Sequence, residues 1–227
     1  MTVEIADSCQ GFVFTAYRPG PDGRPEPAPE TPETRAAEDI FLQKVNWMLR
    51  GRPDLLDTLG CIEGSLEVHL HYGTGFLDEG DHGYFYGRVT EEADSLVLEV
   101  ATDEILQGGR SGHEVLDVVI HEVTHVLDLL DDRPMGDLPG WDDEERAQFE
   151  ALRALERAAI EAGTSALDSY ALTDDREFLA VLVETFFVLP EELRHSSPGL
   201  FSLLHAYFDV DPVAEAATMP LMRPVVV

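Results

Sequence analysis

Positive charge is scarce in this sequence. Its 227 residues contain 15 lysines and arginines against 45 aspartates and glutamates, a formal net charge of −30 at pH 7, and Lys44 is the only lysine. Nucleic acid is not expected as a partner, because basic side chains that would neutralise phosphates are lacking. Anionic membrane surfaces are disfavoured for the same reason. The acidity by itself predicts a strongly solvated surface.

Cysteines and long apolar runs are also scarce. Cys9 and Cys61 are the only cysteines and form no CxxC pair, so two reduced thiols are expected rather than a disulfide framework. Residues 1–10 lack the basic and apolar regions of a secretory signal, and no run approaches the roughly 18 apolar residues of a membrane span. A cytoplasmic location is therefore expected, with one main domain and peripheral additions.

The most informative pattern that is present is HEVTH at residues 121–125. Residues four apart share one face of a helix, so both imidazoles can bind one metal ion, usually zinc, while the glutamate reaches a water on that ion. The surrounding residues 114–130 have the apolar spacing of a buried helix, with Ser111-Gly112 as a start signal and Pro134 as a stop signal. The alternative is a core helix whose histidines only hydrogen-bond to neighbouring groups.

The rest of the chain predicts an α+β fold, with a small mixed sheet followed by the histidine-bearing helix and a mostly helical C-terminal half. Strands are expected at residues 11–17, 65–72, 84–89 and 95–100. Helices are expected at residues 35–50, 143–162, 176–189 and 200–208. Residues 18–34, rich in Pro and Gly, predict an extended and mobile linker, and 211–227 has no clear pattern.

Six histidines lie outside the HEVTH pattern. His69 and His71 share one face of the strand expected at 65–72, and alternation with leucine and valine assigns that face to solvent, so a second metal site is not expected there. The remaining four are isolated and are interpreted as structural: His82, His113, His195 and His205.

A catalytic zinc site usually takes three protein ligands and leaves one position for water. A histidine six residues after His125 would have indicated the metzincin pattern, but position 131 is Asp. Glu177 and Glu184 lie two helical turns apart among apolar residues, where a carboxylate is costly unless paired or metal-bound. Glu177 can instead cap the helix that follows Asp174, and Glu184 can pair with an arginine, so the residues alone leave both open.

Several stretches around these residues resemble the MtfA-type zinc peptidases, also known as glucose-regulated metallopeptidases. They are LVLEVATDEILQGGRSG from Leu96, HEVTHVLDLLDD from His121, LDSYALTDDREFLAVLVETFF from Leu167 and LFSLLHAYFDVDP from Leu200. The zinc domain of anthrax lethal factor is a more distant likeness, with a similar spacing from tyrosine to glutamate. The resemblance covers residues 94–212 and little of residues 1–60.

The resemblance implies a zincin-like fold, a Zn²⁺ ion and a set of roles. His121 and His125 would be zinc ligands, Glu177 the third ligand, Glu122 the catalytic base and Tyr170 the active-site tyrosine. Together with the residue patterns, the expected regions are an N-terminal strand and linker at 1–34, a zincin-like metallopeptidase domain at 35–212 and a tail at 213–227.

Two further side chains are expected around the ligands rather than on the metal. Asp128 matches an aspartate that the family keeps after its second histidine, and it lies close enough to orient an imidazole or to cap the helix face. If Glu177 binds the metal, Glu184 is likewise expected to lie beside the ligands rather than on the metal. The sequence departs from the family at Val123-Thr124 (usually Phe-Ala) and at Leu179 (usually aromatic), which bears on substrate preference rather than on the chemistry.

The resulting hypothesis is a zinc peptidase acting on a peptide or protein, in which Glu122 takes a proton from the zinc-bound water and Tyr170 donates to the oxyanion. The strand at 95–100 is expected to pair with an extended substrate. The competing class is a non-catalytic zinc protein that engages a regulator, because MtfA-type proteins are associated with binding a repressor of sugar uptake. Glu122 and Tyr170 favour the enzyme, since neither is needed to hold a metal. A third option is hydrolysis of a non-peptide amide.

Overall fold

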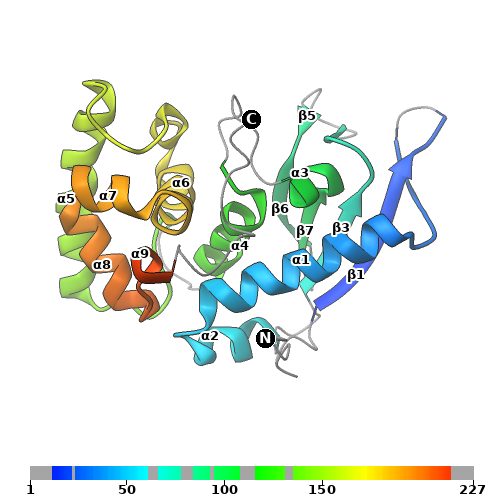
Figure 1. Cartoon of the computed structure of the whole chain (residues 1–227), viewed down its shortest axis with the longest axis horizontal. Helices are drawn as coiled ribbons and strands as arrows, with labels where there is room; N and C mark the ends of the chain where they lie inside the picture. Colours follow the sequence, from blue (N-terminus) through cyan, green and yellow to red (C-terminus); the bar gives the residue numbers. More distant parts are fainter. Residues whose placement is uncertain are drawn as a thin grey trace. The chain divides into compact units, whose positions relative to one another are not determined.

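The structure, a computed structural model, describes residues 12–21, 24–60, 66–77, 84–92, 95–107, 116–130 and 135–215. Contacts divide the chain into an N-terminal unit, residues 1–109, which holds the sheet, and a helical C-terminal unit, residues 110–227 (Figure 1). This order of elements confirms the predicted α+β, zincin-like fold class. The prediction that residues 35–212 form one domain stays a prediction. Some positions discussed above lie outside the described residues: Cys9, Cys61, His82, Ser111, Gly112, His113 and Pro134.

A mixed five-stranded sheet is the framework of the N-terminal unit. Its order is β2 (Pro25–Pro27), β1 (Phe12–Pro19), β3 (Leu66–His71), β7 (Ser95–Ala101) and β6 (Gly87–Glu92). The three central strands are parallel to one another, and the two edge strands are antiparallel to their neighbours. A separate ribbon pairs β4 (Phe76–Leu77) with β5 (Tyr84–Phe85).

One face of the sheet belongs to the hydrophobic core. Leu66, Val68 and Leu70 of β3 alternate along the strand and are at most 2% exposed, as their spacing predicts. Helix α1 (Pro32–Leu49) covers this face, and the Phe41 ring lies edge-on to Phe12, with ring centroids 5.9 Å apart. Two short helices that the sequence pattern did not reveal complete the described part of this unit: α2 (Pro53–Gly60) and α3 (Thr102–Gln107).

The prediction of a linker at residues 18–34 is wrong in part. Strand β1 continues to Pro19, and β2 pairs back onto it. Prolines are tolerated in β2 because it is an edge strand, where the missing N–H groups can face solvent instead of a neighbouring strand. Helix α1 then begins at Pro32, with the Thr31 side chain accepting from the Thr34 backbone N–H at 3.3 Å.

Strand β7 lies inside the sheet, between β3 and β6. Both of its edges are therefore occupied by backbone hydrogen bonds from within the chain. The expectation that residues 95–100 pair with an extended substrate is wrong, because strand addition requires a free edge.

Helices make up the described part of the C-terminal unit. They are α4 (Val118–Leu129), α5 (Asp143–Glu161), the 3₁₀ helix η2 (Ser169–Leu172), α6 (Asp175–Val188), α7 (Pro190–Ser196), α8 (Pro198–Phe208) and α9 (Pro212–Glu215). Their core is rich in aromatic rings, and Phe186 of α6 stacks on Phe208 of α8 with centroids 6.0 Å apart. Within the described residues of both units, no helix combines the length and hydropathy needed to cross a membrane.

The helix that carries the HEVTH pattern starts later than the predicted residue 114. Its first residue is Val118, and Leu116 lies before it in a bend. The Asp117 carboxylate accepts from the backbone N–H groups of Val119, at 3.1 Å, and Ile120, at 3.3 Å. These two bonds satisfy donors that have no partner within the helix, so Asp117 fixes where α4 begins.

Candidate metal centre

Helices α4 and α6 pack against each other in the C-terminal unit and bring three predicted ligands together. His121 Nε2 lies 3.1 Å from one oxygen of Glu177, and His125 Nε2 lies 3.6 Å from the other. One ligand atom from each residue lies within 4.8 Å of the others, and this is the only such group of His, Cys, Asp and Glu among the described residues. The helical spacing of the two histidines predicts this pairing, whereas the approach of Glu177 depends on tertiary packing.

The position of Glu177 follows from the start of α6. The Asp174 carboxylate accepts from the backbone N–H groups of Arg176 and Glu177, both at 2.9 Å, and so caps the helix. The Glu177 carboxylate is directed at the two histidines. The alternative in which Glu177 serves to cap its own helix therefore does not describe this arrangement.

Glu184 lies on the other side of the His121 ring. Its side chain is fully buried, and one oxygen accepts a short hydrogen bond from the Asp117 backbone N–H. The other oxygen lies 3.5 Å from His121 Nδ1. The two nitrogens of His121 thus face two glutamates that lie two turns apart on α6. Glu184 also contacts Asp117, the residue that caps α4. Sequence reasoning missed this link to Asp117, although an aspartate directly before an apolar helical run is a recognisable cap.

The three side chains fit a zinc ion by donor type and spacing. Two imidazole nitrogens and one carboxylate are a donor set that catalytic zinc sites use. One ligand atom from each residue lies within 4.8 Å of the other two, so a modest side-chain adjustment would bring them to the roughly 3.4 Å that separates ligand atoms around a tetrahedral zinc ion.

Glu122 lies next to the site on α4 and is nearly buried. The residue is 4% exposed, and within the described part of the chain its Oε2 atom has no hydrogen-bond partner. Burial raises the pKa of Glu122, and the positive charges of His121 and His125 only partly oppose that rise. A buried carboxylate with a raised pKa is suited to exchanging a proton near neutral pH.

Burial and hydrogen bonds between His121 and the glutamates shift the pKa values of these groups. Burial alone would lower the pKa of His121, but its hydrogen bonds to Glu177 and Glu184 outweigh burial and raise the pKa to about 10. For Glu177, burial is opposed by hydrogen bonds to both histidines, which hold its pKa well below the usual range. Burial raises the pKa of Glu184 in spite of its contact with His121. Zinc binding at neutral pH would therefore displace a proton from His121.

Tyr170 lies in η2 beside the first histidine. The Asp168 carboxylate caps this short helix by accepting from the Tyr170 backbone N–H at 2.8 Å. The Tyr170 ring centroid is 6.1 Å from that of His121, with the ring planes inclined by 32°. The side chain is partly exposed, so the ring flanks the site at its solvent side.

Asp128 does not contact the imidazole of His125 among the described residues. Its Oδ1 atom accepts from the backbone N–H groups of Gly136, at 2.7 Å, and Asp137, at 3.0 Å. Its Oδ2 atom lies 3.3 Å from Nε of Arg176, the residue before Glu177. Asp128 therefore ties α4 to the loop at residues 136–137 and to the first turn of α6.

The other histidines are placed differently from one another. The assignment of His71 to a solvent-facing side is wrong, because it is 4% exposed and its Nε2 lies 3.1 Å from a Glu99 oxygen. His69 is half-buried and lies 3.1 Å from Glu67. His195 and His205 are exposed, and neither belongs to a group of potential metal ligands in the described residues.

Comparison with known proteins gives relatives for this arrangement. Mlc titration factor A of Pectobacterium atrosepticum is 27% identical over 201 residues, which are 78% of this chain and 71% of that protein. The protein of the same name in Serratia proteamaculans is 32% identical over 107 residues, 43% of this chain and 40% of that protein. The protein of that name in Escherichia fergusonii is 30% identical over 112 residues, which are 46% of this chain and 42% of that protein. The matches to the last two span less than half of those proteins.

A family model described as glucose-regulated metallo-peptidase M90 matches residues 73–209, more than half of the chain. The matched segment contains all the residues of the candidate metal centre. It confirms the resemblance drawn from the HEVTH and Tyr170–Glu177 stretches. The chain therefore belongs to the glucose-regulated metallo-peptidase family M90.

Proposed function

We propose that the protein is a zinc-dependent peptidase whose metal is held by His121, His125 and Glu177. The observation that carries this proposal is the convergence of their three ligand atoms beside the buried carboxylate of Glu122. Zinc bound there would polarise a substrate carbonyl and lower the pKa of its water to about 7. Membership of a metallo-peptidase family supports a peptide or protein as the substrate.

Glu122 is the general base in this proposal. It follows a ligand directly on α4, and its raised pKa allows it to take the proton of the attacking water and pass it to the leaving amine. The absence of a hydrogen-bond partner for Oε2 among the described residues leaves that oxygen available to the water.

Tyr170 and Glu184 support the reaction from two sides of His121. The Tyr170 hydroxyl donates to the oxyanion that forms on the substrate carbonyl, and the Asp168 cap holds its backbone in place. Glu184 accepts from the His121 Nδ1–H, which fixes the tautomer that presents Nε2 to the metal. Asp128 acts through the loop and Arg176 rather than through a ligand.

The test compares Glu122→Gln with the native protein. Zinc content measured by atomic emission should stay the same, while kcat on a chromogenic peptide should fall by about 10²–10⁴-fold, the usual contribution of a general base. Glu161→Gln, the same change at the exposed end of α5, is the matched control and should leave both quantities unchanged. Full zinc occupancy with full activity in Glu122→Gln would show that Glu122 is not the general base. Mass spectrometry of the products separates peptide-bond cleavage from hydrolysis of another amide.

A second candidate function is binding of a protein regulator, and it rests on the relatives' name, Mlc titration factor A. A net charge of −30 would favour a partner with a basic surface. Calorimetry of the Glu122→Gln protein against purified Mlc tests this. Saturable binding without turnover would support a binding role beside or in place of catalysis, and the absence of heat at any concentration would contradict it.

A further inference from the structure

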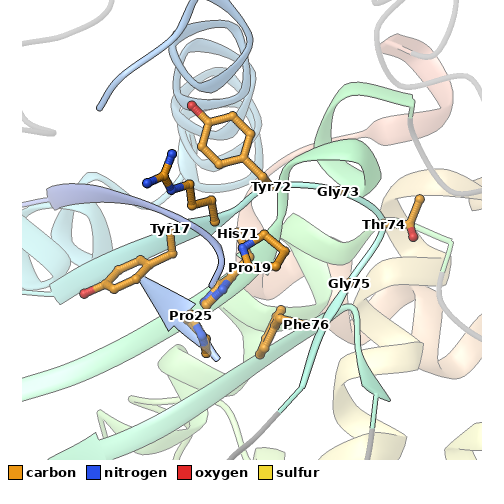
Figure 2. A pocket seen from close by; sticks show the side chains of 10 residues that line it. Tyr17, Pro19, Pro25, His71, Tyr72, Gly73, Thr74, Gly75 and Phe76 are labelled. Carbon is orange, nitrogen blue, oxygen red and sulfur yellow. The ribbon is translucent and has the colours of Figure 1, made fainter. Parts of the chain in front are cut away.

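The N-terminal unit contains a pocket that the metal centre does not use. Its volume is about 360 Å³, within the range of about 300–1,000 Å³ of small-molecule sites. Figure 2 shows the backbone from Tyr72 to Gly75 curving around it, with His71, Pro19 and Phe76 gathered inside the curve. No residue of the candidate metal centre lines it.

The pocket lies where two parallel strands end. Tyr17 and His71 are register partners near the carboxyl ends of β1 and β3, and the chain leaves β3 through the Gly73–Gly75 loop. Crevices at the carboxyl ends of parallel strands are common ligand sites, because the loops there diverge from the sheet. Gly73 has φ +98°, a conformation that side chains disfavour, so this loop depends on its glycine.

The floor of the pocket is rigid. His71 and Phe76 are 4% and 6% exposed, and their rings stack with centroids 4.1 Å apart and planes 19° from parallel. His71 Nε2 bonds to Glu99, and the second oxygen of Glu99 accepts from Arg88. Arg88 also lies over the Phe76 ring, 5.7 Å from its centroid. The imidazole and the phenyl ring are therefore held in place before any ligand arrives.

The walls carry rings, and the one permanently charged side chain that lines the pocket is an arginine. Six of the ten lining residues carry a ring: Tyr17, Pro19, Pro25, His71, Tyr72 and Phe76. Arg18 is exposed at the pocket, and no acidic residue lines it, although the chain contains 45 aspartates and glutamates. Among the described residues Arg18 has no ion-pair partner, so its guanidinium is available to an anion.

We propose that this pocket binds a small aromatic carboxylate. The flat ring of the ligand packs against the rings of the walls, where offset and edge-on contacts are favourable. Its carboxylate bonds to the Arg18 guanidinium, which has the planar donor geometry for that group. The His71 nitrogen that Glu99 does not use supplies a further polar contact at the floor.

The experiment uses the full chain loaded with zinc and two probes, phenylacetate and indole-3-acetate. Titration followed by ¹⁵N–¹H spectra should give saturable shifts at the amides of Gly73, Thr74 and Gly75. The uncharged phenylacetamide and indole-3-acetamide, and the non-aromatic hexanoate, should bind much more weakly. Arg18→Gln should weaken the carboxylates by about tenfold, the loss expected for one charge-assisted hydrogen bond.

Arg35→Gln is the matched control, because Arg35 is an exposed arginine of the same unit that does not line the pocket. It should leave the affinity unchanged. The proposal is overturned if neither carboxylate shifts these amides, if the amides or hexanoate bind equally well, or if Arg18→Gln and Arg35→Gln behave alike. Since Arg18 is exposed, its replacement leaves the fold intact, and an unchanged thermal unfolding curve verifies this.

Discussion

Two buried histidines of this protein each contact a buried glutamate, but only one of these sites includes an arginine. In the N-terminal unit, Glu99 divides its oxygens between His71 and Arg88. In the C-terminal unit, His121 contacts Glu177 and Glu184, and no arginine or lysine bonds to either glutamate among the described residues. The first cluster is balanced in charge, and the second carries an excess of carboxylates.

The pKa values of the glutamates follow that difference. Burial would raise the pKa of Glu99, but hydrogen bonds from His71 and Arg88 outweigh burial and lower it. Burial raises the pKa of Glu122 and Glu184, where only histidines and no arginine or lysine oppose it. Glu177, which hydrogen-bonds to both histidines, is the one glutamate of this cluster whose pKa is lowered. A carboxylate cluster that lacks a permanent cation is suited to a metal ion, which supplies the missing positive charge. The comparison thus separates a structural histidine from a candidate ligand, although both are buried beside a carboxylate.

Removing the third ligand should have the largest effect. In Glu177→Ala, zinc affinity should fall by more than about 100-fold, since even residues that only support a ligand cost 10–100-fold. In Glu99→Gln, at the balanced cluster, zinc content should not change. Competition with a chromogenic chelator measures both. Tight zinc binding by Glu177→Ala would move the ligand role to Glu184. Glu177 and Glu99 would then be alike, because neither would be needed to hold zinc.

Neutralising Glu184 should have a smaller effect on the metal. Glu184→Gln keeps the size of the side chain but weakens its acceptance of the His121 Nδ1–H, so zinc affinity should fall by about 10–100-fold. A loss greater than that of Glu177→Ala in the same chelator competition would reverse the proposed roles.

The sequence predicted the parts of this centre that depend on local geometry. The spacing of His121 and His125 places both on one face of any helix, whatever packs against it. The choice between Glu177 and Glu184 was open, because both lie on one face of α6, and only the packing of α4 on α6 decides which glutamate faces the Nε2 atoms. The family resemblance supplied that choice, and the geometry is in line with it.

The predictions that were wrong depended on packing and strand pairing, which the residue pattern within one segment does not reveal. His71 was assigned to solvent because of alternation along β3, yet Phe76 stacks on its ring and buries it. Strand β2 exists because it pairs with β1, and its three residues Pro25–Pro27 show no strand pattern by themselves. Position within a sheet is likewise non-local, so β7 was mistaken for a strand that substrate can reach.

The pH dependence of zinc binding should be about tenfold per pH unit. In the metal-free protein, the pKa of His121 is raised from 6.5 to about 10, so its proton must leave when zinc binds at neutral pH. Apparent affinity should therefore rise with pH between about 6.5 and 8.5. Chelator competition at several pH values measures it. A flat profile would show that His121 is neutral before zinc arrives.

Replacing the cap of α4 should have the smallest effect. Asp117→Ala removes the carboxylate that accepts from Val119 and Ile120 and should lower the free energy of unfolding by about 1 kcal/mol. The backbone N–H that bonds to Glu184 remains, but fraying of the first turn should loosen it and weaken zinc binding a few-fold. Asp142→Ala removes the matching cap of α5 and should cost similar stability with no effect on zinc. Urea denaturation and chelator competition give the two quantities. Equal zinc affinity in the two variants would show that the start of α4 does not control the position of His121.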